Sequence, residues 1–161
     1  MKADREILAE RAKALATPLM PPPADTIELV TFQLANETYG IESRYVVEVF
    51  PLAQLAAMPG ARPPVFGLTG WRGELLPVLD LRPVLGVAST GLNDLSRVIV
   101  LGEARAAFGV LADAVREIVT LPLSEVREPP EGVAAARDYL RGVTGQALLV
   151  LAAEQLLKLH A

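Results

Sequence analysis

The residue types that most often carry out enzyme chemistry are scarce in this chain of 161 residues. Cysteine is absent, and the single histidine, His160, is the penultimate residue. One histidine cannot build the usual metal site, and without cysteine there is no thiolate nucleophile and no disulfide. Neither a serine–histidine–aspartate arrangement nor a glycine-rich phosphate-binding motif occurs. The sequence therefore predicts a protein that is not an enzyme and that holds no metal and no cofactor.

Carboxylates are the remaining candidates for acid–base chemistry, and Glu48 and Glu117 are the most suggestive pair. The two glutamates occupy equivalent positions of an internal repeat, which is described below. We therefore expect them in two different lobes and not in one pocket. A solvated helix face explains them better than catalysis does, with Glu48 as a candidate contact to a partner. A small β-fold enzyme that uses dispersed carboxylates remains a remote alternative.

The most informative polar residues surround the only tryptophan, Trp71. Trp71 is either a contact that concentrates binding energy or a buried core residue, and the sequence favours neither. Arg72 follows it and forms an Arg-Gly turn with Gly73. An exposed arginine often forms a surface ion pair of little energetic weight. Because Arg72 has no counterpart in the second copy of the repeat, we predict instead that it orients a groove for a partner by pairing with Glu48 or Asp80.

The residues that follow this turn predict a strand and its end. The apolar run from Leu75 to Leu81 reads as a buried strand, and Gly70 and Gly73 mark positions where a side chain would be in the way. Asp80 and Arg82 lie two residues apart, so they point to the same face of a continuing strand. A strand-end ion pair is the favoured explanation of these two charges. A contact to a partner is the alternative.

The composition is globular, with 52% apolar and 21% charged residues. The net charge of −4 and the lack of a lysine or arginine cluster argue against nucleic acid as a partner. A β-barrel that binds RNA or single-stranded DNA also needs stacking aromatics and a basic groove, which are missing. The longest apolar runs are too short to span a bilayer, and the N-terminus does not read as a secretory signal. We expect a cytoplasmic protein without direct membrane insertion.

The first 24 residues are predicted to be an extension of the domain that follows. Residues 1–16 are rich in helix formers, and the prolines at 21–23 predict a stiff linker. Residues 25–161 are expected to form one domain of two β subdomains that are not independent. Its predicted elements are hairpins at 27–34 with 38–41, 96–101 with 107–110 and 139–151, short helices at 43–48 and 113–117, the strand at 75–81 and a closing helix at 152–159.

Two sequence patterns recur in the same order. The first is Tyr39-Gly40-Ile41 with Val46-x-Glu48-Val49, which returns 69 residues later as Phe108-Gly109-Val110 with Val115-x-Glu117-Ile118. The second is Gly70-x-x-Gly73-x-x-Leu76-x-Val78-Leu79, which returns 72 residues later as Gly142-x-x-Gly145-x-x-Leu148-x-Val150-Leu151. This predicts two similar lobes, each built from a hairpin, a short helix and a second hairpin, that pack together or close into barrels. The match places Trp71-Arg72 opposite Val143-Thr144, so charged residues found in one copy only are candidates for function.

With both patterns in place, the chain resembles the CheW-like domain family, which comprises chemotaxis coupling proteins and the matching regulatory domain of their histidine kinase. The resemblance spans residues 27–159. It is carried by the repeat motifs above together with Gly67-x-x-Gly70-x-Arg72-Gly73-x-x-x-Pro77-Val78-x-Asp80-Leu81-Arg82 and Tyr139-Leu140-x-Gly142. It implies a mainly β fold of two SH3-like five-stranded β-barrel subdomains packed around a shared core, with short helices and an N-terminal helical extension.

The resemblance also implies a non-enzymatic adaptor. Such a protein bridges the cytoplasmic tip of a methyl-accepting chemoreceptor and the regulatory domain of the chemotaxis histidine kinase, at the inner face of the membrane within receptor arrays. In the family the receptor tip lies in a groove between the lobes. Carried over by motif position, the receptor-binding residues are Val46, Glu48 and Arg72, with Trp71 and Gly73 beside them, and Asp80 and Arg82 become candidate kinase or groove contacts. A coupling protein of a non-flagellar array, such as one for surface motility, is the nearest alternative.

Overall fold

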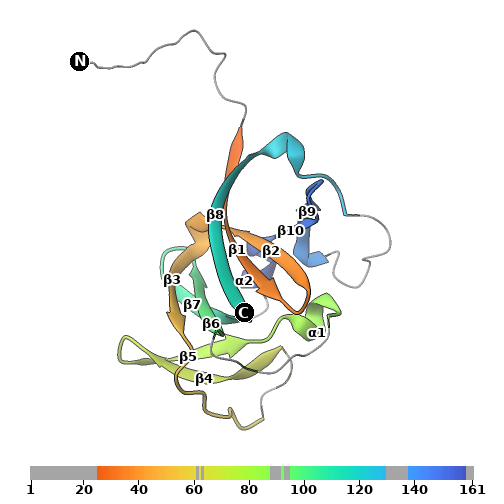
Figure 1. Cartoon of the computed structure of the whole chain (residues 1–161). Helices are drawn as coiled ribbons and strands as arrows, with labels where there is room; N and C mark the ends of the chain where they lie inside the picture. Colours follow the sequence, from red (N-terminus) through yellow and green to blue (C-terminus); the bar gives the residue numbers. More distant parts are fainter. Residues whose placement is uncertain are drawn as a thin grey trace, which may run out of the picture.

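The computed structural model describes residues 25–60, 62, 64–87, 92, 95–129 and 138–158, and the predicted helix at 1–16 lies outside them. Within this part of the chain ten strands form two five-stranded sheets (Figure 1). Barrel 1 has the strand order β8-β1-β2-β10-β9, with β1 (Thr26–Leu34), β2 (Glu37–Glu42), β8 (Ala114–Pro122), β9 (Leu140–Val143) and β10 (Leu148–Leu151). Barrel 2 has the order β3-β6-β7-β5-β4, with β3 (Val46–Pro51), β4 (Val65–Trp71), β5 (Glu74–Leu79), β6 (Arg97–Gly102) and β7 (Ala106–Ala112). The prediction of a mainly β fold is confirmed.

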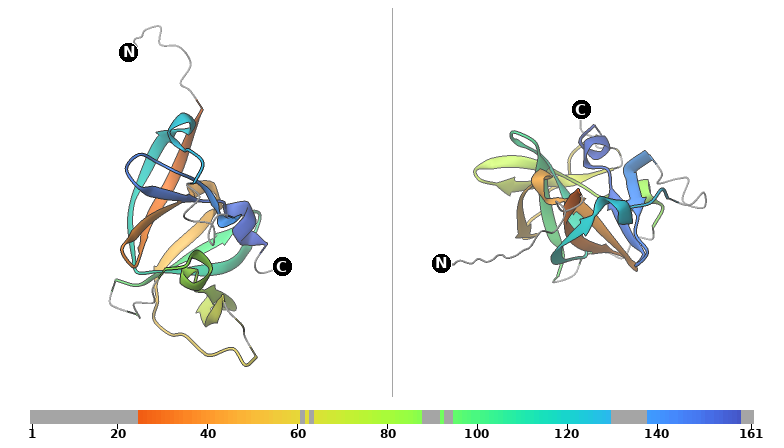
Figure 2. Two further views of the ribbon diagram at one scale, coloured as in Figure 1. Left: turned by 90° about the vertical axis from the view of Figure 1, so that its right-hand side faces the viewer. Right: turned by 90° about the horizontal axis from the view of Figure 1, so that it is seen from above.

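The two sheets exchange hairpins between the two halves of the chain. The repeat makes β1 to β5 equivalent to β6 to β10, and each sheet combines the hairpin of one half with the last three strands of the other. Barrel 2 is therefore continuous from β3 to β7, whereas barrel 1 joins the beginning and the end of the chain, as both views of Figure 2 show. The predicted lobes, each made from one half only, are wrong in this respect. The register is nevertheless the same in both, because Val78 lies opposite Gly109 and Val150 lies opposite Gly40.

Each barrel is closed by one short backbone bridge beyond its edge strands. Ala56 pairs antiparallel with Leu68 of β4, and both of their backbone hydrogen bonds are 2.8 Å long. Arg127 and Val143 of β9 form the equivalent pair, with bonds of 2.7 and 3.0 Å. A closed sheet leaves little edge for pairing with other chains. The closing segment follows the third strand of each half of the chain, β3 in barrel 2 and β8 in barrel 1.

The strand register of the two hairpins shifts the correspondence between the glycines of the two copies by three residues. Gly67 lies opposite Val78 in the first hairpin, and Gly142 lies opposite Val150 in the second. The structural counterpart of Gly142 is therefore Gly67, not Gly70 as the sequence match predicts. A Cβ atom at Gly142 would lie 2.5 Å from a backbone oxygen and one at Gly67 2.6 Å, whereas one at Gly70 would meet nothing within 4 Å. The prediction that Gly70 excludes a side chain is wrong, and Gly67 has that role.

The apolar side chains form three clusters. A small one lies inside each barrel: Ile27, Leu29 and Val150 in barrel 1, and Leu76, Val78, Val98, Val100 and Leu111 in barrel 2. The largest is built from strands of both sheets together with α1 (Arg82–Leu85) and α2 (Ala153–Leu157), and it includes Phe32, Tyr39, Ile41, Leu81, Leu101, Phe108 and Leu156. Burial of apolar surface is the main favourable term in folding. Because both sheets contribute to this cluster, we infer that the two subdomains depend on each other.

Both short helices predicted at the repeat positions are wrong. Only η1 (Ser43–Tyr45) forms in the first stretch, and β3 begins at Val46. In the second stretch β8 begins at Ala114, and η2 (Leu123–Glu125) forms later. The β-branched residues in these segments lose side-chain freedom in a helix and pack well on a sheet. The closing helix is shorter than predicted, and no helix in the described residues is long and apolar enough to cross a membrane.

Replacing Gly109 with alanine is expected to lower the free energy of unfolding by about 1–3 kcal/mol. The new Cβ atom would lie 2.3 Å from Cγ1 of Val98, which is fully buried, so either the side chain or the strand must move. Gly70→Ala is the matched control, because it adds the same methyl group to a strand position with open space. Its stability should stay unchanged or rise by up to about 1 kcal/mol. Urea unfolding of both variants measures the difference, and equal destabilisation would contradict the packing.

Candidate functional site

The predicted Arg-Gly turn is the tip of the β4–β5 hairpin. Trp71 lies opposite Glu74 in the last pair of the ladder, which leaves Arg72 and Gly73 as a two-residue loop. Their φ angles are 50° and 79°. Positive φ at both central residues defines a type I′ turn, and Arg72 is an unusual choice for its first position. Such a turn matches the twist of the strands, so the hairpin holds the Arg72 backbone in one orientation.

This tip is an extension that the other barrel lacks. In β4–β5, Leu68 and Pro77 lie opposite each other nine positions apart, whereas in β9–β10 the equivalent pair, Val143 and Leu149, is six apart. The tip therefore has no counterpart at residues 143–144, contrary to the predicted match. Figure 1 shows the hairpin reaching outward beside β3, at the lower left of the molecule. A structural repeat explains the body of the hairpin but not its additional residues.

Three side chains meet at this tip, and we call them the Glu48–Trp71–Arg72 cluster. Nη2 of Arg72 donates to Oε1 of Glu48 at 2.8 Å, and Nε1 of Trp71 donates to the same oxygen at 3.1 Å. The guanidinium carbon of Arg72 lies 4.4 Å from the centroid of the indole ring. One carboxylate oxygen thus holds both donors, while the cation stacks on the ring. The predicted pair of Arg72 with Glu48 is present, and Asp80 is not its partner.

Trp71 combines the two roles that the sequence leaves open. Its half-buried ring packs against the core of barrel 2, together with Phe50. Its other surroundings are Arg72 and Glu48, whose side chains are 64% and 38% exposed. A tryptophan with one side buried against the core and the other side exposed to solvent is typical of protein interfaces. The cluster is therefore both fixed by the barrel and accessible to a partner.

A β-bulge directs Glu48 toward the tip. Val46 lies opposite Leu101 and Glu48 lies opposite Val100, so Val47 is an extra residue in β3. Bulges commonly re-aim a side chain near a functional site. Val46 packs against the shared core, and Val47 is the exposed neighbour at 39%. Of the predicted receptor contacts, Val46 is therefore the one that packs against the shared core.

One apolar residue beside the tip is missing from the sequence-based prediction. Leu75 lies opposite Gly70 in β5, and 72% of its surface is exposed. Its neighbour Leu76 faces the core of barrel 2. Alternation along a strand means that Leu75 and Leu76 cannot both point inward. That alternation is the signal which identifies Leu75 as a candidate contact.

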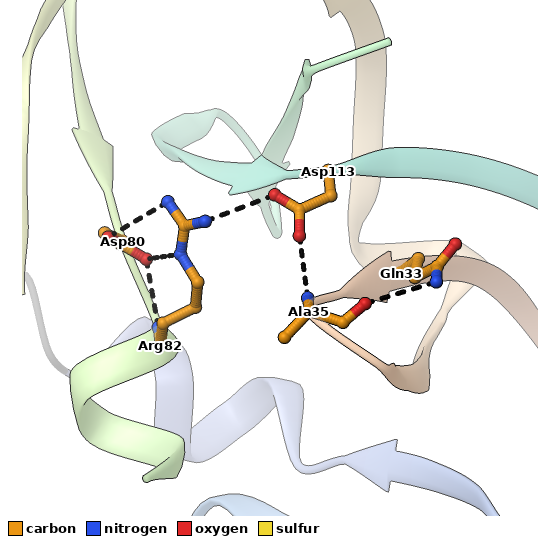
Figure 3. A network of polar contacts seen from close by, with 5 residues as sticks. All are labelled: Gln33, Ala35, Asp80, Arg82 and Asp113. Carbon is orange, nitrogen blue, oxygen red and sulfur yellow. Dashed lines mark hydrogen bonds and ion pairs between the residues drawn. The ribbon is translucent and has the colours of Figure 1, made fainter. Parts of the chain in front are cut away.

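Asp80 and Arg82 lie inside the protein, in an ionic cluster with Asp113 (Figure 3). Nε and the backbone N–H of Arg82 donate to Oδ1 of Asp80 at 2.9 and 3.0 Å, and Nη1 donates to Oδ1 of Asp113 at 3.2 Å. Oδ2 of Asp113 accepts the backbone N–H of Ala35 at 2.7 Å. The side chain of Arg82 is only 2% exposed. The favoured prediction of an ion pair at the strand end thus describes what is present, and the burial of Arg82 does not suit a surface contact.

This ionic cluster joins the two barrels. Asp80 and Arg82 follow β5 of barrel 2, Ala35 belongs to the β1–β2 turn of barrel 1, and Asp113 lies where the chain crosses from β7 to β8. A buried charge is tolerated where its partners are close and hydrogen-bonded. We infer that Arg82 fixes how the barrels meet. The sequence does not identify Asp113 as a member, because its partners are 31 and 78 residues away.

Replacing Glu48 with alanine is expected to shift the fluorescence emission of Trp71 to longer wavelength. The indole loses its acceptor and the guanidinium loses its anchor, so water reaches the ring more easily. Because Trp71 is the only tryptophan, its emission reports on this cluster alone. Glu117→Ala changes the equivalent glutamate of barrel 1 and should leave the emission unchanged. A spectrum that is insensitive to Glu48→Ala would show that the cluster does not persist in solution.

The fold and the site define a two-barrel protein with an exposed contact cluster, which is the construction of a scaffold. The chain matches the family model for the CheW-like domain over residues 28–160 and belongs to this family. Its members are scaffolding proteins and not enzymes. The predicted family and the predicted adaptor class are therefore confirmed, as is the prediction that the protein is not an enzyme.

Individual relatives support this assignment over most of the chain. Chemotaxis protein CheW of Klebsiella aerogenes is 31% identical over 127 residues, which cover 77% of this chain and 76% of the relative. Protein FrzA of Myxococcus xanthus is 33% identical over 116 residues, which cover 72% of each. The crystal structure of the scaffolding protein TtCheW from Thermoanaerobacter tengcongensis has a TM-score of 0.71 at 24% identity and covers 80% of this chain and 90% of that one. That structure supports the fold.

Proposed function

We propose that this chain couples methyl-accepting chemoreceptors to a chemotaxis histidine kinase. The Glu48–Trp71–Arg72 cluster binds the cytoplasmic tip of the receptor, and a different face binds the regulatory domain of the kinase. The observation that carries the proposal is the hairpin tip, because the repeat does not account for it and it presents a preoriented arginine on a tryptophan. Arginine and tryptophan are enriched among the residues that dominate binding energy. The receptors would hold the protein in the cytoplasm at the inner face of the membrane.

The cluster is suited to binding without further ordering. Arg72 is held at its backbone by the turn and at its guanidinium by Glu48. Ordering a long flexible side chain costs conformational entropy on binding, and a side chain that is already ordered avoids most of that cost. Arg72 donates to Glu48 through Nη2, and the exposed part of the guanidinium can donate to a carboxylate or carbonyl of a partner. Leu75 adds exposed apolar surface beside it.

A coupling protein of a non-flagellar chemosensory array is the second candidate. The chain is 33% identical to protein FrzA and 31% identical to a chemotaxis protein CheW, and the coverage is similar. This near equality does not favour one array over the other. Both candidates use the same cluster toward a receptor-like helix tip, so they share the experiment below and differ in the receptor that it should contain.

The adaptor function is tested by retention of the kinase domain on a receptor. A receptor signalling-domain fragment is immobilised, and the kinase regulatory domain is applied with and without the full chain. We expect the regulatory domain to be retained far more strongly when the chain is present. If the chain bound each partner alone but never both together, the bridging proposal would fail. Added nucleotide should not be hydrolysed in any of these mixtures.

A further inference from the structure

The two barrels differ at the end where Trp71 lies in barrel 2. There, at what we call the mouth of barrel 2, the half-buried ring of Trp71 packs against the core cluster that includes Val100 and Leu76, and Phe50 packs against the same cluster. The equivalent residues of barrel 1 are Thr31, Leu148 and Val119, since the repeat offsets are 69 for the first strands and 72 for the hairpins. Barrel 1 has the shorter hairpin and so lacks a residue in the place of Trp71. Its mouth is therefore open.

The open mouth is a cavity of about 290 Å³, and Thr31, Thr38, Arg116, Glu117, Val119, Gln146 and Leu148 line it. Val119 and Leu148 supply an apolar floor that belongs to the core of barrel 1. The hydroxyl of Thr31 donates to the backbone carbonyl of Glu117 and so fixes the wall. Thr31 is 5% exposed, and the floor residues Val119 and Leu148 are half-buried. The cavity is thus shaped by residues that the barrel itself holds in place.

Glu117 gives this mouth the same acceptor that barrel 2 uses. It is the counterpart of Glu48 at the repeat offset of 69, and each glutamate lies at the bulge of its strand. Glu48 accepts from Trp71 and Arg72. Glu117 is exposed, and no side chain in the described residues is seen to donate to its carboxylate. Arg116, the nearby cation, donates to Oε1 of Gln33.

We propose that the mouth of barrel 1 is a docking site for a tryptophan side chain of a protein partner, next to an arginine. The ring lies on Val119 and Leu148, and the indole N–H and the guanidinium donate to Glu117, as Trp71 and Arg72 do to Glu48. A carboxylate above an apolar floor complements an aromatic ring that carries a donor. This site is on the other barrel from the Glu48–Trp71–Arg72 cluster and does not depend on the receptor interface.

The test is a titration of the ¹⁵N-labelled full chain with the peptide acetyl-Gly-Trp-Arg-Gly-amide, which has the sequence of residues 70–73. We expect saturable shifts of the amide signals of Thr31, Glu117 and Leu148, with a dissociation constant on the order of 1 mM. The same peptide with leucine in place of tryptophan should bind at least fivefold more weakly. Shifts confined to the β4–β5 tip, or no saturable shifts, would overturn the proposal.

Two variants locate the site. Glu117→Gln removes the charge of the acceptor and should weaken the peptide at least threefold. Gln146→Trp places a tryptophan on the exposed turn at the edge of the mouth. Its ring should occupy the cavity in place of the ring of the peptide and abolish peptide binding. Glu125→Gln is the matched control on the same barrel and should bind the peptide as the parent does. Undiminished binding by both Glu117→Gln and Gln146→Trp would place the peptide elsewhere and refute the assignment.

Discussion

Replacing Arg82 with alanine is expected to lower the free energy of unfolding by about 3–5 kcal/mol. The change removes a cation that is 2% exposed and leaves the carboxylates of Asp80 and Asp113 beside each other at 12% and 13% exposure. A buried charge without its partner is costly because neither water nor a counter-ion replaces what is lost. The backbone contact of Asp113 to Ala35 would also lose its support. Urea unfolding followed by circular dichroism measures the effect.

Arg44 provides the matched control for this prediction. The repeat relates Arg44 to Asp113, so it occupies the same crossover in the other half, yet its side chain is 66% exposed, and its partner Glu42 keeps a second ion pair with Arg141. Arg44→Ala should therefore change stability far less than Arg82→Ala. Adding Asp80→Asn to Arg82→Ala should recover part of the loss, since one uncompensated charge is removed. If Arg82→Ala cost no more than Arg44→Ala, the cluster would not be what joins the barrels.

Replacing Arg72 with glutamate is expected to weaken binding to a receptor signalling-domain fragment on the order of 30-fold, or by about 2 kcal/mol. The new carboxylate cannot donate to an acceptor on the receptor, and it repels Glu48 at the position where the guanidinium now lies 2.8 Å away. Stability should change little, because exposed ion pairs contribute roughly 0–1 kcal/mol. Isothermal titration calorimetry gives the affinity, and a thermal melt gives the stability.

Arg127→Glu is the control for a change of charge alone. Arg127 is exposed on barrel 1 and takes part in the fold through its backbone bridge to Val143. The same reversal of charge there should leave receptor affinity within about twofold, because long-range effects between exposed charges are screened. Equal losses for Arg72→Glu and Arg127→Glu would mean that net charge, and not the cluster, determines binding.

The strands of this fold follow from local patterns, but their partners do not. The runs that contain Phe32, Val100 and Val150 alternate or are apolar and β-branched, so each strand is evident from its own sequence. Whether β8 pairs with β6 of its own half or with β1 of the other half depends on contacts between residues such as Leu29 and Val119, 90 positions apart. A repeat predicts that the two sheets are alike. It does not determine whether each hairpin joins the sheet of its own half or that of the other half. The exchange is decided by packing in the shared core.

The candidate site was predictable to the extent that it differs from the repeat. Trp71 and Arg72 stand out because the other half has neither the ring nor the charge at the matching positions, whereas Glu48 recurs as Glu117 and enters as a candidate partner of Arg72. Their geometry was not predictable, because it depends on how the two hairpins of the repeat align. By spacing alone, Gly142 matches either Gly67 or Gly70. The close approach of backbone at Gly67 settles that choice and reveals the tip as an extension.

The most direct test of the receptor contact is a titration of the ¹⁵N-labelled full chain with a receptor signalling-domain fragment, read from amide signals. The account predicts that Glu48, Arg72, Gly73 and Leu75 lose intensity or shift first, together with the indole N–H of Trp71. The signals of Thr31 and Glu117 in barrel 1 should stay in place. Changes confined to barrel 1, with an undisturbed Trp71 indole signal, would contradict the assignment of the cluster to the receptor.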